Sequence, residues 1–72
     1  MKTPLVVMFL DAAARHAFNA KNHQNLDVRE FEREHMEYAF QNALSCRNLS
    51  IRHRNEVQVI RQKYRDELKG IV

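Results

Sequence analysis

An apolar stripe with helical spacing runs along the second half of the chain. Between Asp27 and Lys69 the sequence contains no glycine and no proline. At about 100° per residue, one narrow face collects Val28, His35, Ala39, Ala43, Cys46, Ser50, His53, Val57, Ile60, Tyr64, Leu68 and Ile71. This pattern predicts an all-α protein in which the stripe is buried against other helices, some of them from a second copy of the chain.

The first expected helix covers about residues 4–20. Thr3 is a suitable N-cap, and Pro4 fits the first helical position because the N–H that it lacks has no partner there. Apolar side chains lie on both sides of this helix: Leu5, Phe9, Ala12, Ala13, His16 and Ala20 on one side, and Val7, Ala14 and Phe18 on the other. We therefore expect this helix to pack on two sides, with its alanines allowing close approach of a neighbour.

A polar interval, residues 21–26, separates this helix from the next. Asp27, followed three residues later by Glu30, resembles a capping box, and Leu26 and Phe31 are spaced as a hydrophobic staple. We expect Asp27 to be the N-cap of a second helix over about residues 28–46.

The end of the second helix is ambiguous. A break within residues 47–55, where Asn48, Ser50 and Asn55 are possible caps, gives a third helix over about 51–69. The alternative is one arm over residues 28–69, much longer than the mean helix of about 11–12 residues. That arm carries a coiled-coil heptad, with Met36, Ala43, Ser50, Val57, Tyr64 and Ile71 at one position and Ala39, Cys46, His53, Ile60 and Glu67 at the other. The expected architecture is thus a helical hairpin or a small three-helix arrangement.

The length of 72 residues predicts a single helical domain, residues 1–72, with a small core. A chain of this size buries only about 60% of the surface that its unfolded form exposes. Cys46 is the one cysteine, so no disulfide can form within the chain. We therefore expect a homodimer whose self-association contacts are Val57, Ile60, Tyr64 and Leu68.

The apolar run near the N-terminus does not match a targeting segment. The run Leu5–Leu10 is shorter than the roughly 7–15 residues of a signal-peptide core, and Asp11 follows it directly. No stretch approaches the ~20 apolar residues needed to span a bilayer, and a lone Cys46 fits a reducing compartment. The sequence predicts a soluble, cytoplasmic protein with no membrane partner.

The net charge of +3 is unevenly distributed. Residues 27–37 contain five acidic residues and two arginines, whereas residues 38–55 contain three arginines and no acidic residue. On a continuous helix a basic ridge forms beside the apolar stripe, made of Arg47, Arg54, Arg61, Arg65 and Lys69. Such a ridge either flanks a helix–helix contact or follows the phosphates of a nucleic acid. The second hypothesis makes Arg47, Arg54, Arg61 and Arg65 the candidate nucleic-acid contacts.

No residue pattern indicates catalysis, a cofactor or a metal centre. No two histidines stand at the i, i+4 spacing of a helical metal site, and Gly70 is the only glycine, so a phosphate-cradling loop is not expected. His16, His35 and His53 fall on apolar stripes, either as hydrogen-bonded core histidines or as groups that make assembly sensitive to pH. We expect a protein that is not an enzyme.

In size, charge and all-helical texture the chain resembles the small accessory proteins encoded in the early regions of temperate bacteriophages and prophages. The resemblance spans the whole chain and assigns no functional positions. It implies a regulatory adaptor that acts by protein contact. The function expected from the sequence is a non-enzymatic, self-associating helical adaptor with an unidentified protein partner, and the alternative is a nucleic-acid-binding regulator that uses the basic ridge.

Overall fold

The computed structural model describes residues 4–70 and consists of α-helices joined by short connections. α1 spans Leu5–Asn22, α2 spans Leu26–Leu44 and α3 spans Ile51–Leu68, and no strand occurs in these residues. The all-helical class and the three-helix alternative are confirmed. The single arm over residues 28–69 is wrong, and with it the heptad that needed one continuous helix.

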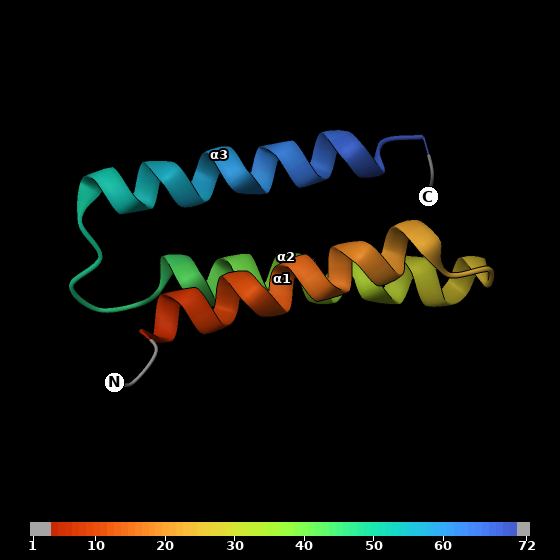
Figure 1. Ribbon diagram of the computed structural model, residues 1–72, viewed down its shortest axis with the longest axis horizontal. Coiled ribbons are helices and arrows are strands. Elements are labelled where there is room, and N and C mark those ends of the chain that lie inside the picture. The colour runs from red at the N-terminus through yellow and green to blue at the C-terminus, as the bar shows by residue number, and fades with distance from the viewer. Residues whose placement is uncertain (1–3, 71–72) are drawn as a thin grey trace.

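α1 and α2 form a closely packed antiparallel hairpin, which contains most of the core (Figure 1). Its buried side chains are Ala13, Ala17 and Ala20 from α1, and Met36, Ala39, Phe40 and Ala43 from α2. Phe40 and Met36 are the largest of the fully buried side chains. The small alanine side chains let the two backbones approach, and Met36 and Phe40 fill the space that remains.

Two predicted helix starts need correction. α1 begins at Leu5, and the carbonyl of Pro4 accepts from the N–H groups of Val7 and Met8 at 3.0 and 3.2 Å. The expected cap Thr3 lies outside the described residues. α2 begins two residues before its expected start, because the side chain of Asn25 accepts from the N–H groups of Asp27 and Val28.

Asp27 is therefore not the N-cap of α2, as the sequence had predicted, but a residue of its first turn. A carboxylate is still favourable there, at the positive end of the helix dipole. Leu26 and Phe31 are both more than half exposed, so the expected staple is not a buried contact.

The connection 45–50 replaces the middle of the predicted long helix. Ser50 caps α3 by accepting from the N–H of His53 at 3.1 Å, whereas Asn55, another candidate cap, lies inside the helix. Asn48 adopts a φ of 62°, in the left-handed region that asparagine tolerates better than most residues. The cap at Ser50 and the turn at Asn48 therefore interrupt the helix here, although the apolar periodicity of the sequence continues through it.

α3 lies beside the hairpin and packs on it much less closely than α1 and α2 pack on each other (Figure 1). Val57 and Leu68 are buried, and Ile60 and Tyr64 are partly buried against the core. The rings of Tyr64 and Phe40 have centroids 6.0 Å apart. Helices of the same subunit thus cover, wholly or in part, the stripe residues Val57, Ile60, Tyr64 and Leu68. Ser50 and His53 are exposed contrary to expectation, and Ile71 lies outside the described residues.

Candidate functional site

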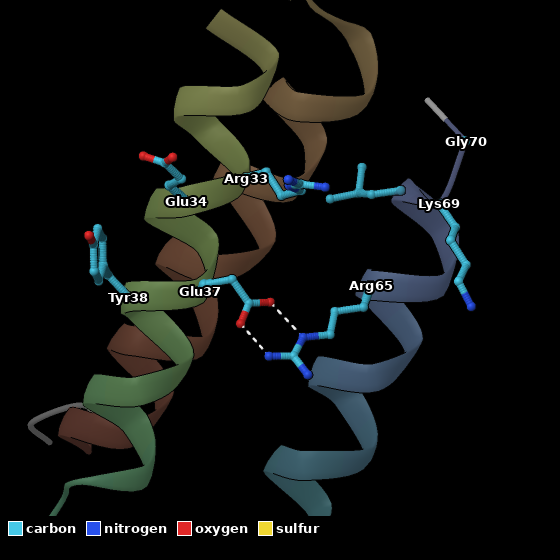
Figure 2. A pocket seen from close by; sticks show the side chains of 8 residues that line it. Arg33, Glu34, Glu37, Tyr38, Arg65, Lys69 and Gly70 are labelled. Atoms are coloured by element: carbon cyan, nitrogen blue, oxygen red, sulfur yellow. Dashed lines mark hydrogen bonds and ion pairs between the residues drawn. The ribbon is translucent and has the colours of Figure 1, made fainter. Parts of the chain in front are cut away.

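A carboxylate on α2 holds two arginines of α3. Glu37 Oε2 accepts from Nε and Nη2 of Arg61 at 3.0 and 2.7 Å. Arg65 donates from Nε to Glu37 Oε1 at 2.8 Å and from Nη2 to Oε2 at 2.7 Å (Figure 2). We call Glu37, Arg61 and Arg65 the α2–α3 clamp. It is the main polar link between the hairpin and α3.

The clamp is partly withdrawn from solvent. The side chain of Arg61 is 15% exposed and that of Glu37 is 24% exposed, whereas Arg65 is nearly half exposed. Hydrogen bonds from Arg65 lower the pKa of Glu37, and with the contribution of Arg61 they outweigh the burial that raises it. The same contact raises the pKa of Arg65. Glu37 is therefore held as a carboxylate, which suits a structural ion pair rather than proton transfer.

An open groove lies beside the clamp, between α2 and the C-terminal end of α3. Its lining includes Arg33, Leu68, Lys69 and Gly70. Figure 2 shows Arg33 and Glu37 reaching toward α3, whereas Glu34 and Tyr38 lie on the side of α2 turned away from it. The groove is lined by side chains of both charges together with Tyr38 and Leu68, so it has the character of a contact surface.

The residues of the predicted basic ridge do not form one row in the structure. Arg54 donates from Nη1 to the carbonyl of Leu44 at 2.8 Å, at the end of α2. Arg61 and Arg65 belong to the clamp, Arg47 lies in the connection 45–50, and Lys69 follows the end of α3. Three of the four candidate nucleic-acid contacts therefore have partners within the chain. Their role toward nucleic acid stays a prediction.

The expected self-association residues lie on the side of α3 that faces the hairpin. Val57 is 2% exposed and Leu68 is 3% exposed within one subunit. Ile60 and Tyr64 pack against the same core. A second copy can therefore reach Val57 and Leu68 only if α3 moves away from its own hairpin, whereas Ile60 and Tyr64 keep part of their surface exposed. Their contact with a second copy remains a prediction.

A second surface is centred on His35, where α1 and α2 meet. The ring of His35 is 4.1 Å from that of Phe31 and 5.4 Å from that of His16, measured between centroids. His16 Nδ1 lies 2.5 Å from Oε2 of Glu32, and Tyr38 meets the edge of His35 with ring centroids 6.0 Å apart. These rings form one cluster that links α1 to α2.

Helical geometry places two more apolar side chains on the side of α1 that carries His16. α3 borders the side of α1 that carries Ala14, Ala17 and Phe18. Leu5, Met8 and His16 fall roughly half a turn away from it at about 100° per residue. We call the following residues the aromatic face: Leu5, Met8, His16, Phe31, His35 and Tyr38. The four that are not histidine are each more than half exposed.

Sequence reasoning missed both features. Glu37 had been grouped with the acidic start of the second helix, and Arg61 and Arg65 with the ridge. The available signal was that Arg61 and Arg65 stand at i, i+4 beside Val57 and Leu68, so both flank the buried side of one helix. The acid that meets them depends on how the helices are arranged.

Within residues 4–70, no cluster of three or more histidine, cysteine, aspartate or glutamate side chains could hold a metal ion. None of the helices in that part of the chain combines the length and the hydropathy that crossing a membrane requires. Comparison with protein-family models, with curated proteins and with solved structures finds no match to this chain.

Proposed function

We propose that this chain is a non-enzymatic, self-associating helical adaptor that acts through protein–protein contacts. The proposal assigns it no catalytic residue, cofactor or metal. Its setting is the cytoplasm, where the free thiol of Cys46 stays reduced. A regulatory role in a temperate bacteriophage or prophage agrees with the size, charge and all-helical texture of the chain.

The observation that carries the proposal is the aromatic face. Contiguous exposed apolar surface on a small protein marks a contact site more often than single exposed residues do. Leu5, Met8, Phe31 and Tyr38 are each about half exposed, so covering them contributes roughly 1 kcal/mol per side chain. Aromatic side chains are also enriched among the residues that dominate binding energy.

The polar members of the aromatic face favour a partner protein whose surface carries polar groups over a purely apolar surface. His16, His35 and the Tyr38 hydroxyl offer hydrogen-bonding groups among the apolar side chains, which is the mixture typical of non-obligate interfaces. Glu32 lies beside His16 and adds an acceptor at the edge.

Site-specific photo-crosslinking in the native host tests the proposal. Benzoyl-phenylalanine introduced at Tyr38 lies on the aromatic face, whereas the same group at Gln62 lies on exposed α3 surface away from it. We expect one or a few protein adducts from position 38 and none of them from position 62. Adducts identical at both positions, or absent at both, would remove the support for this face.

The identity of the adduct separates the two parts of the proposal. A product with the mass of two copies of this chain assigns the face to self-association. A product with a different protein assigns it to the partner, and self-association then rests on another surface of the molecule.

A further inference from the structure

The attachment of α3 is made of few and separable contacts. Its apolar part is Val57 and Leu68, supported by Ile60 and Tyr64. Its polar part is the α2–α3 clamp and the hydrogen bond from Arg54 to the carbonyl of Leu44. α1 and α2, in contrast, pack closely on each other and supply seven of the nine buried core side chains of the described residues. The hairpin can therefore keep its core when α3 leaves it.

The composition of the connection 45–50 is compatible with helix. Residues 45–50 contain no glycine and no proline. Asn48 is the one non-glycine residue among residues 4–70 with a positive φ, and Ser50 is extended with a ψ of 159°. Both backbone positions must change before α2 and α3 can form one helix. In a straight helix the stripe through Ala43, Cys46, Ser50 and Val57 keeps its phase.

We propose that two copies of this chain exchange α3. The connection 45–50 becomes helical, α2 and α3 join into one long helix, and the α3 segment of each copy packs on the hairpin of the other. This inference rests on the proposed self-association and names its mode. The occupant of the α3 site is a second copy because only the same segment reproduces the apolar and clamp contacts already present.

The exchange reconciles a sequence prediction with the observed packing. The sequence predicts that Val57, Ile60, Tyr64 and Leu68 contact a second copy, and in the structure they pack, wholly or partly buried, within one subunit. In the exchanged dimer these residues pack on the partner's hairpin. The contacts are the same as in one subunit, but they now join two copies. The carbonyl of Leu44, which now accepts from Arg54, gains a helical N–H partner instead.

Charge reversal across the clamp tests the exchange. One variant carries Glu37→Arg, and the other carries Arg61→Glu with Arg65→Glu. Each variant alone places like charges at the clamp, whether α3 packs within the copy or on the partner. After joint refolding, the mixed exchanged dimer pairs opposite charges at both clamps, so native mass spectrometry should show mostly the mixed dimer. If the wild-type protein dimerises but the mixed dimer is not enriched over the two single-variant dimers, the exchange is overturned.

Asn48 supplies a second test that leaves the core and the clamp intact. Asn48→Gly favours the present turn, because glycine adopts positive φ without steric cost. Asn48→Ala disfavours that turn and favours helix. We expect the dimer dissociation constant of the alanine variant to be lower than that of the glycine variant by at least about tenfold. Equal dissociation constants contradict the exchange, even where a charge variant fails to fold.

These outcomes separate this inference from the proposed function. A wild-type dimer that responds to neither test leaves the self-associating adaptor in place and removes the exchange. Wild-type protein that stays monomeric at all concentrations removes both the exchange and the self-association. Adducts at Tyr38 then still report on the aromatic face.

Discussion

Glu37 on α2 and Arg65 on α3 form a two-point ion pair, with Arg65 Nε 2.8 Å from Oε1 and Nη2 2.7 Å from Oε2 of the carboxylate. The planar guanidinium matches the carboxylate at both atoms, which adds orientation to attraction. Arg61 shares the same carboxylate from one turn earlier. α3 is thereby fixed in rotation about its own axis, which its sparse apolar contacts alone would fix less well.

Replacing Glu37 by glutamine should loosen α3. Glu37→Gln removes the charge and one acceptor oxygen while keeping the shape of the side chain. We expect a loss of about 1–2 kcal/mol in the free energy of unfolding, because the clamp is only partly buried. For a domain of this size, that lowers the melting temperature by roughly 4–16 °C. Glu34→Gln, exposed on the same helix, is the matched control, and equal effects of the two variants would contradict the role of the clamp.

Acid should weaken the same contact. The pKa of Glu37 is lowered by hydrogen bonds from Arg65, so the folded protein holds this proton less tightly than the unfolded chain does. The stabilisation is therefore complete above the ordinary value of 4.5 and is lost as pH falls through the lowered pKa. Urea unfolding from about pH 6 to about pH 3 should show a steeper loss for wild type than for Glu37→Gln. If the free energy of unfolding falls in parallel for the two proteins, Glu37 contributes nothing to its pH dependence.

The cap of α3 should contribute measurably to stability. Ser50→Ala removes the side-chain acceptor of the His53 N–H and should cost about 1 kcal/mol. Ser45→Ala is the control, since the Ser45 hydroxyl only donates back to the carbonyl of Gln41. Circular dichroism melts of the two variants should differ, and a stable Ser50→Ala protein would show that α3 does not depend on this cap.

Close packing of the hairpin should fail when a long charged side chain enters it. Ala13 is fully buried on α1, so Ala13→Arg both overpacks the contact and buries an unpaired charge. We expect a loss of at least about 3 kcal/mol and no cooperative melting transition. Asn19→Arg, on the exposed side of α1, should melt like the wild type. Cooperative melting of the Ala13 variant at the wild-type temperature would contradict the buried position.

The nucleic-acid alternative makes its own prediction. A regulator that uses Arg47, Arg54, Arg61 and Arg65 must bind duplex or single strands with an affinity that falls as salt rises. Since Arg54, Arg61 and Arg65 have partners within the chain, we expect no such binding in a gel-shift series. Salt-sensitive retention that Arg47→Ala weakens would favour the alternative over the adaptor.

The sequence predicted the helices well because their signals are local. The alanine spacing in α1 follows from side chains within one or two turns. The break before α3 was one of two alternatives, and Ser50 was one of three candidate caps, each a local signal. The cap of α2 was misplaced because Asn25 and Asp27 are nearly equal capping residues two positions apart. Which of the two residues becomes the cap depends on the exact geometry of the turn.

The contact surfaces could be predicted only in part. Periodicity identified Val57 and Leu68 as buried but not which helix covers them. Glu37 meets Arg61 and Arg65 across 24 and 28 residues, and no local rule selects that partner. The aromatic face was missed for the same reason, because exposure of Phe31 and Tyr38 depends on which side of the hairpin α3 occupies.

Self-association is the claim on which the rest of this account depends most. Sedimentation velocity of the unmodified chain over a range of micromolar concentrations measures it directly. We predict a boundary that moves from monomer toward dimer as concentration rises, through a reversible equilibrium. A single monomer boundary with the same sedimentation coefficient at every concentration would contradict the claim.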